Sequence, residues 1–415
     1  MKIAIVSSFD LDGGAARAAS RLHAALREQG CDSRMFVQVR TSHDATVDGA
    51  SAGLPKAIGR LRPLIDHAPA KMLGSRLGEF SLNWLSGNIL SRLRRFNPDI
   101  VHLHWINGGF ISINDIASLE WPVIWTAHDM WPFTGGCHYD QECGKFAEQS
   151  CASCPMLPSY PLMEIAHRRL LKKAQVAAKV NVTFVAPSRW MADVAQGSPV
   201  GKQRGIHVIP NGVDLNLFKP IDKSAARQLF SLPSDKTILA FGAVNSNSDP
   251  RKGFTHLDAM LRHLSTTALR QSTMLCVFGT PTSGAGELHG IPVRFIGHLH
   301  DDVSLVALYS AADVFVAPSL QDNLPNTVLE ATACGTPSIG FNVGGMSDLI
   351  DNGCTGILVD QLAGGALAER LLANLKLAGW LARASVAARR KAELQFSSQT
   401  YADAHLRLYK SLLNG

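Results

Sequence analysis

Short apolar runs rich in β-branched residues alternate with amphipathic stretches along almost the whole chain. In the first half, the runs lie at residues 2–8, 33–39, 99–105, 122–129 and 182–188. In the second half, they lie at residues 237–244, 274–279, 292–299, 312–319, 337–343 and 355–360. Buried strands that alternate with helices are typical of parallel sheets covered by helices. The pattern therefore predicts an α/β protein with doubly wound sheets.

Glycine, proline and polar residues concentrate near residues 196–212, between the two sets of strands. We therefore expect an N-terminal domain at residues 1–200 and a C-terminal domain at residues 201–390. The chain reads as helical from about Ala366 to Leu413, and we expect residues 391–415 to pack back on the N-terminal domain. Because ligands of such sheets bind outside the carboxyl ends of the strands, the expected active site is the cleft between the domains.

The composition excludes several classes of protein. The 415 residues are 46% hydrophobic and 18% charged, enough for two cores and too apolar for extensive disorder. No window approaches ~18 consecutive apolar residues, and Asp10 ends the first apolar run, so we expect neither a membrane span nor a signal peptide. A net charge of +6 is too diffuse to indicate nucleic acid as a partner. The expected location is the cytoplasm.

Glycines occupy the turn after the first strand of the chain. Gly13 and Gly14 stand where that strand passes into a helix, and the backbone amides of such a turn can hold an anion. A turn that serves only the strand-to-helix geometry is the alternative. Asp10 and Asp12 lie in the same loop, and we interpret them as surface turn residues rather than as a metal-binding pair.

Histidines stand at the ends of the runs at residues 99–105 and 122–129. His128 is followed by an acid and by a glycine-rich loop, which favours a functional side chain over a core histidine. For His102 and His104, a functional role and a hydrogen-bonded place in the core are both open.

Cations and acids of the second half combine in a pattern that suits a phosphorylated ligand rich in hydroxyls. Arg251 and Lys252 stand just before a helix, where cations and helix-start amides can hold a diphosphate. Asp322 lies in a loop after a strand, and Glu330 lies one turn or more into the following helix. Two acids so placed can both face one ligand, while the helix start faces its phosphate.

Taken together, these stretches resemble the retaining glycosyltransferases of family four, which have the GT-B fold of two Rossmann-like domains facing a central cleft. The resemblance is carried by GGAARAA at 13–19, HD at 128–129, IPNGVD at 209–214, RKG at 251–253, YSAADVFVAPS at 309–319 and the acid pair ending in EATACGTP. The stretch TAHDMWPFTGGCHY at 126–139 resembles more narrowly the bacterial exopolysaccharide transferases of the colanic-acid type.

Carried over to the matching positions, the resemblance implies a role for each site residue. Lys252 would neutralise the donor diphosphate, Asp322 would contact hydroxyls of the donor sugar, and Glu330 would bind the ribose. His128 would lie beside the reacting carbon and the acceptor. The other donor-binding residues that it implies are Gly13, Gly14, Arg251, Asn323, Leu324 and Thr327. No catalytic metal is expected on this interpretation, because side chains and amides take its place.

Two departures from the family pattern change the expected site. The family usually has Glu at the position of Asp322, so the shorter side chain must reach the sugar from a shifted backbone or through water. The family also commonly has Arg shortly after the first strand of the C-terminal domain, where the stretch FGAV of this chain has Ala243. A phosphate-binding charge is thus missing, and whether Arg251 replaces it is open.

Half of the eight cysteines fall into one short segment. Cys137, Cys143, Cys151 and Cys154 could close a structural zinc site and hold a long loop in place. Disulfides or free thiols are the alternative. A catalytic zinc is not expected, because cysteine would fill all four positions.

Basic and apolar positions interleave at residues 56–96, and HRRLLKKA at 167–174 adds further basic residues. Such segments can lie on an anionic membrane surface, whereas a basic helix face in water is the alternative. Lipid-linked acceptors, which the family resemblance makes plausible, favour the inner face of the cytoplasmic membrane.

The expected function is transfer of a hexose, with retention of configuration, from a nucleotide diphosphate sugar to a hydroxyl of a saccharide acceptor. We expect this acceptor to be lipid-linked and the pathway to be exopolysaccharide or cell-surface polysaccharide synthesis. A nucleotide-sugar epimerase on the same fold and a non-catalytic subunit of a membrane polysaccharide synthase are the alternatives. The donor base, the sugar and the acceptor are left open by the sequence.

Overall fold

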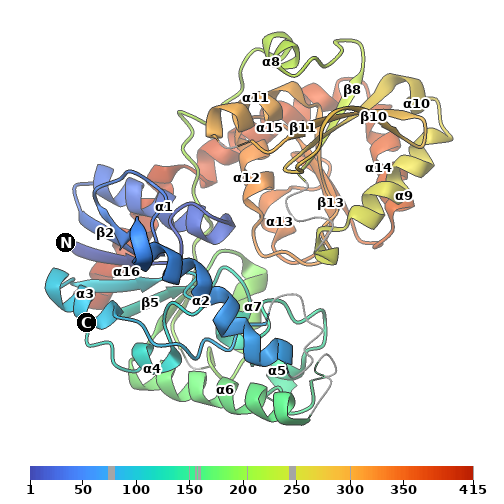
Figure 1. Cartoon of the computed structure of the whole chain (residues 1–415). Coiled ribbons are helices and arrows are strands. Elements are labelled where there is room, and N and C mark those ends of the chain that lie inside the picture. Colours follow the sequence, from blue (N-terminus) through green and yellow to red (C-terminus); the bar gives the residue numbers. More distant parts are fainter. Residues whose placement is uncertain are drawn as a thin grey trace. The chain divides into compact units, whose positions relative to one another are not determined.

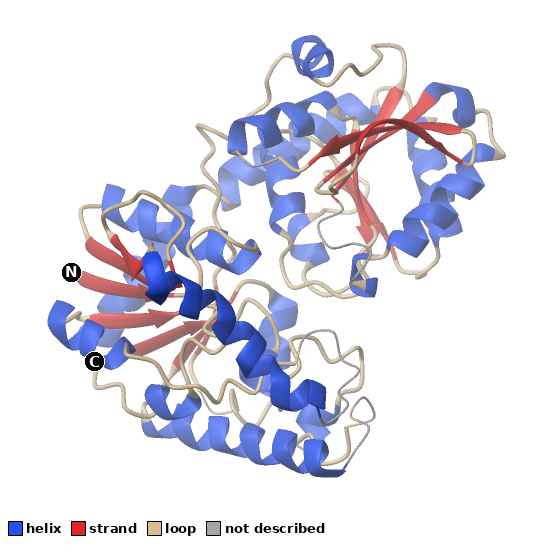
Figure 2. Ribbon diagram, in the orientation of Figure 1, coloured by secondary structure: helices blue, strands red, loops and turns tan. Residues whose placement is uncertain are grey.

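The computed structural model describes every residue except 73–79, 149, 155–156, 158–159, 203, 243–248, 300 and 415. The chain divides into two compact units, of which the first comprises Met1–Gly212 with Ser398–Gly415 and the second comprises Val213–Ser397. Within its described residues, each unit contains one seven-stranded sheet with helices on both faces (Figure 2). The expected α/β class with two doubly wound sheets is confirmed.

The first unit is built on a wholly parallel sheet. Its strands are β1 (Lys2–Val6), β2 (Asp32–Val39), β3 (Val47–Ala50), β4 (Ile100–Leu103), β5 (Val123–Thr126), β6 (Thr183–Ala186) and β7 (Ile206–Val208). Its helices are α1 (Gly14–Glu28), α2 (Gly53–Met72), α3 (Ile89–Phe96), α4 (Ile113–Ile116), η1 (Trp131–Phe133), α5 (Lys145–Glu148), α6 (Tyr160–Lys179), α7 (Arg189–Gly197) and α16 (Ser398–Asn414). The strand order β3-β2-β1-β4-β5-β6-β7 reverses direction at β1.

The second unit has a parallel sheet with one antiparallel edge strand, β10. Its strands are β8 (Thr237–Gly242), β9 (Thr273–Phe278), β10 (Ser283–Leu288), β11 (Ile291–Gly297), β12 (Val314–Ala317), β13 (Ser338–Phe341) and β14 (Gly356–Val359). Its helices are α8 (Lys223–Leu229), η2 (Pro250–Lys252), α9 (Phe254–Ser265), α10 (Leu269–Ser272), α11 (Asp302–Ala311), α12 (Asn326–Ala333), α13 (Met346–Leu349), α14 (Gly364–Leu375) and α15 (Trp380–Gln395). The order β10-β11-β9-β8-β12-β13-β14 reverses at β8.

The division between the units lies later in the chain than the expected residue 200. Residues 206–208, which the sequence places in a connection, form β7 and pair in parallel with β6 as the edge of the first sheet. The first unit therefore continues to Gly212. Strands β3 and β10 were also not expected, since both are short, polar and interrupted by glycine.

The C-terminal segment is helical as expected and forms the three helices α14, α15 and α16. Gly379 adopts φ 67° between α14 and α15, and α15 ends at Gln395. Helix α16 packs beside α1 of the first unit (Figure 1), and it buries Tyr401, Leu408 and Tyr409 in the core there. Residues 391–397 belong to the second unit, because α15 packs on α12. The segment that returns to the first unit therefore begins at Ser398, seven residues after the expected 391.

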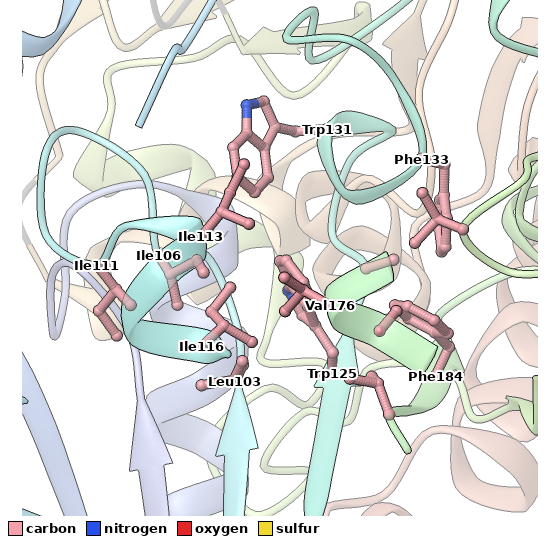
Figure 3. Close-up of a cluster of buried hydrophobic side chains, with 14 of the residues drawn as sticks. Leu103, Ile106, Ile111, Ile113, Ile116, Trp125, Trp131, Phe133, Val176 and Phe184 are labelled. Carbon is pink, nitrogen blue, oxygen red and sulfur yellow. The ribbon is translucent and has the colours of Figure 1, made fainter. Parts of the chain in front are cut away.

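Aromatic residues dominate one face of the first sheet. Trp125 of β5 and Phe184 of β6 stack with their ring centroids 6.0 Å apart, close to Val176 of α6 (Figure 3). Trp131 and Phe133 of η1 close the same cluster and are almost fully buried. Burial of each such side chain stabilises the fold by roughly 1.5–3 kcal/mol. Trp131 and Phe133 therefore anchor the loop that carries η1 in the core.

We predict that Gly364→Ala destabilises the second unit. A Cβ atom at Gly364 would lie 2.2 Å from the carbonyl oxygen of His256 in α9, so α14 would have to move away from its neighbour. The expected loss is about 1–3 kcal/mol in the free energy of unfolding, measured by urea denaturation. The control is Gly365→Ala, one residue later, whose Cβ would make only an ordinary contact at 3.7 Å with His263. Equal stabilities for the two variants would contradict the close approach.

Candidate active site

In the second unit, the loops that follow β8 and β12 meet where the strand order reverses. The backbone N–H of Leu320 donates to the carbonyl of Arg251 at 2.8 Å, which joins the two loops. Gly253 has φ +70°, and a Cβ atom there would lie 1.8 Å from the carbonyl oxygen of Pro318. Only glycine permits this approach, so the chain brings η2 directly against the loop after β12.

The cations of this region have acid partners. Lys252 Nζ lies 2.8 Å from Asp322 Oδ2, and the two side chains are 36% and 10% exposed. Arg251 Nη2 lies 2.7 Å from Asp249 Oδ2 in its own loop. Two residues that the sequence singled out separately, Lys252 and Asp322, are therefore brought together as one ion pair.

Asp322 is held by its backbone as well as by its side chain. The N–H of Gly345 donates to the Asp322 carbonyl at 3.0 Å, and a Cβ atom at Gly344 would lie 1.8 Å from the same oxygen. Asn323 and Leu324 follow and are buried, with Leu324 in the hydrophobic core of the unit. The loop after β12 is thus fixed from both sides.

Glu330 lies on α12, one turn after the helix begins behind Pro325. Its side chain is buried and accepts a hydrogen bond from the Tyr309 hydroxyl of α11 at 3.0 Å. Thr327 lies in the first turn of the same helix and is half-buried. Ala243 lies outside the described residues. The donor-binding roles of these residues remain predictions.

In the first unit, the glycine turn stands at the start of α1. Gly13 adopts φ 88°, and a Cβ atom there would meet nothing within 4 Å, so the turn is open beside the helix start. Asp10 is not a surface residue as expected, because it is buried and accepts hydrogen bonds from Thr41 and from the N–H of Ser42. Although burial opposes its charge, these hydrogen bonds hold the pKa of Asp10 below its usual value.

The histidines at the strand ends have different surroundings. His102 is completely buried, with Nδ1 2.7 Å from the Tyr409 hydroxyl and Nε2 2.7 Å from Thr126 Oγ1. It is therefore a hydrogen-bonded core histidine. His104 Nδ1 lies 2.8 Å from Nε2 of His128, so His104 contacts a predicted site residue, and a functional role for His104 stays a prediction.

Asp129, next to His128, orders the surrounding loop. Its carboxylate accepts hydrogen bonds from the Trp131 N–H at 2.9 Å and from the Trp105 indole at 3.0 Å. His138 Nδ1 lies 2.6 Å away, and its Nε2 lies 2.9 Å from Ser81 Oγ. Burial would raise the pKa of Asp129, but the contacts with His138 and the hydrogen bonds lower it below the usual value.

Lys173 stabilises the same loop through contacts with its backbone carbonyls and with the Trp131 ring. This lysine of α6 is buried, donates to the carbonyls of Trp131 and Thr134, and has its ammonium 3.4 Å from the Trp131 ring centroid. Burial lowers the pKa of Lys173 well below its usual value. A residue that the sequence assigned to a basic surface therefore lies in the interior.

The expected zinc site at the cysteine segment remains a prediction. In the part of the chain that the structure describes, no group of three or more His, Cys, Asp or Glu side chains is placed to hold a metal ion. Burial raises the pKa of Cys137 to about 12 and that of Cys151 to about 11, so both are neutral thiols at neutral pH. Among the described residues, no disulfide joins the cysteines of this segment, which are Cys137, Cys143, Cys151 and Cys154.

Sequence reasoning did not identify Tyr309, His138 or Lys173 as contributors to the site. Tyr309 stands in the stretch YSAADVFVAPS, but its contact with Glu330 depends on how α11 packs against α12. His138 lies in a loop and contacts Asp129, and Lys173 lies on a helix and contacts Trp131. Neither spacing along the sequence matches the period of a helix or a strand. Nothing in the sequence alone indicated these pairings.

The comparison with protein families accounts for most of the chain. Residues 12–217 match the profile described as Glycosyltransferase Family 4, and residues 235–376 match the profile described as Glycosyl transferases group 1. The chain is a family-four-type glycosyltransferase. The expected enzyme class is thereby confirmed.

Relatives agree in sequence with this assignment to the glycosyltransferases. A D-inositol 3-phosphate glycosyltransferase of Mycobacterium leprae is 28% identical over 75% of this chain and 69% of its own length. Another of the same name, from Actinosynnema mirum, is 29% identical over 63% of this chain and 60% of its own.

Solved structures share the GT-B fold over the full length. Sucrose-phosphate synthase of Thermosynechococcus elongatus has a TM-score of 0.72 at 19% identity and covers 100% of this chain and 99% of its own. Anabaena HepE, solved with UDP-glucose, has a TM-score of 0.63 at 16% identity, over 99% of this chain and 100% of its own. These likenesses are of fold.

We predict that the glycosyltransferase loses stability as the pH falls from about 6.5 toward 4. Burial lowers the pKa of His128 and of His405 to about 4, whereas unfolded histidines titrate near 6.5. Above pH 6.5 both states are neutral, and below it protons bind only to the unfolded chain. Each of these histidines then contributes a loss of about 1 kcal/mol at pH 5.5, measured by urea denaturation at pH 7.5 and 5.5.

Two variants check the origin of this loss. His405→Gln removes one buried histidine and reduces the difference in stability between the two pH values. His43→Gln removes an exposed histidine and leaves that difference unchanged. The same difference in the wild type and in His405→Gln would count against the buried ring as its source.

Proposed function

We propose that this glycosyltransferase moves a hexose from a nucleotide diphosphate sugar to a hydroxyl of a lipid-linked saccharide, with retention of anomeric configuration. The pathway we assign is exopolysaccharide or cell-surface polysaccharide synthesis, at the inner face of the cytoplasmic membrane. The observation that carries the proposal is the Lys252–Asp322 ion pair beside the start of α12, at the switch point of the second sheet.

The ion pair supports a diphosphate site. Lys252 is held at the switch point with about a third of its side chain exposed, so an incoming anion can reach it. The start of α12 carries no side-chain cap and no acid in its first turn. A diphosphate would meet the ammonium and the positive end of the helix dipole together.

The reaction that we assign needs this charge. The bond between the anomeric carbon and the diphosphate oxygen breaks, and a bond from that carbon to the acceptor oxygen forms on the same face. The proton of the acceptor hydroxyl passes to the departing phosphate. Because negative charge grows on the diphosphate, Lys252 stabilises the transition state more than the bound donor. Asp322 then exchanges its lysine partner for a sugar hydroxyl.

The nucleoside end of the donor is assigned to Glu330. Its buried carboxylate is oriented by the Tyr309 hydroxyl and lies one turn behind the helix start, a suitable place for two ribose hydroxyls. Anabaena HepE, which shares the fold, was solved with UDP-glucose, which supports a nucleotide sugar as the donor. His128 is assigned to the acceptor side of the reaction, on the first unit.

A membrane-facing surface is proposed on α2. Leu54, Ile58, Leu61, Ile65 and Met72 follow one another at helical spacing and are 47% to 86% exposed. They form an apolar stripe on the face opposite the buried Gly59, Asp66 and Ala70. Arg60 and Lys71 are exposed beside this stripe. Such a helix lies in the headgroup region with its apolar face inserted.

The basic contribution to that surface is smaller than the sequence predicts. Arg62 of α2 donates to the carbonyls of Gly109 and Ser86, and Lys173 is buried. None of the described helices is long and apolar enough to cross a bilayer. Adsorption through the apolar stripe of α2 is therefore the mode of contact that we propose.

We predict that Lys252→Ala lowers kcat for sugar transfer by about a thousandfold while leaving the fold intact. Loss of one preorganised cation at the leaving group removes roughly 3–4 kcal/mol of transition-state stabilisation. Initial rates are measured with UDP- and GDP-sugars and a panel of lipid-linked acceptors. The control is Lys376→Ala, an exposed lysine after α14, for which the rate stays at the wild-type value. A fully active Lys252→Ala variant would remove the assigned role.

Calorimetric titration with UDP and GDP separates binding from turnover in the same experiment. Glu330→Gln weakens binding of the preferred nucleotide, since it loses a charged partner of the ribose. Asp322→Asn releases Lys252 from its ion pair and does not weaken that binding, although turnover falls. Donor conversion without any acceptor would indicate an epimerase. Binding without transfer to any acceptor would indicate a non-catalytic subunit.

We predict that the protein binds vesicles containing phosphatidylglycerol and that Ile58→Asp with Leu61→Asp lowers this binding by about tenfold. Two charges in the apolar stripe oppose insertion by more than 1.4 kcal/mol, roughly a factor of ten in affinity. Vesicle sedimentation measures the bound fraction. Leu229→Asp, at an exposed apolar position of the second unit, is the control and binds as the wild type does. Equal binding by all three proteins would contradict the assignment of α2.

A further inference from the structure

His104 stands directly after β4, and its backbone is fixed on both sides. Its N–H donates to the Val6 carbonyl of β1 at 2.8 Å, and its carbonyl accepts the Trp125 indole N–H at 3.1 Å. The residue is 1% exposed. Its ring lies between those of His102 and His128, with centroid separations of 4.4 and 5.1 Å. The ring is therefore enclosed by its neighbours.

The contact between the two histidine rings admits one proton. His104 Nδ1 and His128 Nε2 are 2.8 Å apart, and burial lowers the pKa of both side chains, so that both rings are neutral. Either His104 donates from Nδ1, or His128 donates from Nε2. The choice between these two arrangements decides which nitrogen of His128 carries its proton.

The other nitrogen of His104 distinguishes the two arrangements. His104 Nε2 is buried and has no hydrogen-bond partner among the described residues. If His128 were the donor, His104 would carry its proton on Nε2 and leave a buried N–H without an acceptor. Buried N–H groups without partners are rarer than buried acceptors without partners. The arrangement with the proton on His104 Nδ1 is therefore favoured.

We propose that His104 is a positioning residue that donates from Nδ1 to His128 Nε2 and thereby holds His128 in the Nδ1–H tautomer. In this tautomer the Nε2 of His128 is occupied by the His104 N–H and does not act as a base. This agrees with a reaction in which the departing phosphate takes the acceptor proton. The catalytic part of the inference rests on the proposed function of His128, but the tautomer itself does not.

The tautomer can be measured directly by ¹⁵N NMR on the ligand-free protein labelled at histidine, with the His128 signals assigned from their loss in His128→Asn. In the wild type we expect His128 to carry its proton on Nδ1. His104→Leu removes the donor and shifts the ¹⁵N signals of His128 toward a mixture of both tautomers. His104→Asn keeps an N–H donor near the position of Nδ1 and retains the wild-type signals.

The matched control is His102→Asn, a substitution in β4 two residues before His104. His102 contacts Tyr409 and Thr126 rather than His128, so this variant loses stability without a change in the tautomer of His128. For sugar transfer, His104→Leu lowers kcat by about tenfold, the value of one hydrogen bond, with unchanged nucleotide affinity. His104→Asn restores most of that rate, which loss of packing alone does not explain.

Three results would overturn the inference. They are a wild-type His128 protonated on Nε2, unchanged His128 signals in His104→Leu, and equally slow transfer by His104→Leu and His104→Asn. The NMR measurement needs no substrate, so it decides the role of His104 even if the protein proves to transfer no sugar. In that case the proposed function fails and the tautomer assignment stands.

Discussion

Parallel strands place all of their carboxyl ends at one edge of a sheet, and the rest of this structure depends on that constraint. Where the strand order reverses, at β1 in the first unit and at β8 in the second, the loops on either side run apart and leave polar groups to be satisfied by one another. In the second unit this brings Lys252 from the loop after β8 to Asp322 from the loop after β12. Gly253 holds the loop after β8 against the loop after β12, and Gly344 holds the loop after β13 against the same loop, because no side chain fits at either place. The proposed site therefore lies where the topology brings backbone segments unusually close together.

The first unit buries charged and imidazole side chains in its interior, close to the carboxyl edge of its sheet. Asp129 is compensated by the indole of Trp105, a backbone N–H and the His138 ring, and Lys173 is compensated by two carbonyls and an aromatic face. A buried charge without such partners would cost several kcal/mol, so these contacts are a condition for folding as well as for function. The loop between them carries η1, which lacks the ladder of a strand yet is fixed by Trp131 and Phe133 in the core.

The sequence was informative wherever a local period or a strong local preference decides the structure. β-Branched runs such as residues 2–8 and 312–319 became central strands, since burial on both faces requires continuous apolar sequence. Three of the four edge strands were missed because their pairing comes from a neighbour: β3 and β10 contain glycine, and β7 carries only Ile206–Val208. Site residues that follow a strand, such as His128 and Asp322, could be placed at an edge. The burial and partners of individual charged residues could not be predicted, because Asp10, Arg62 and Lys173 form hydrogen bonds with groups in distant elements.

The path of the backbone between the units has a consequence for engineering. The chain leaves the first unit after Gly212 and re-enters it at Ser398, so residues 213–397 are topologically an insertion. The two crossings lie side by side, with the Val213 N–H bonded to the Phe396 carbonyl at 2.8 Å and Val213 bridged to Ser397. An exchange of the second unit between homologous transferases therefore needs a cassette with two adjacent splice points. A chimaera cut once, near residue 212, would separate Tyr409 from His102 and open the core of the recipient half.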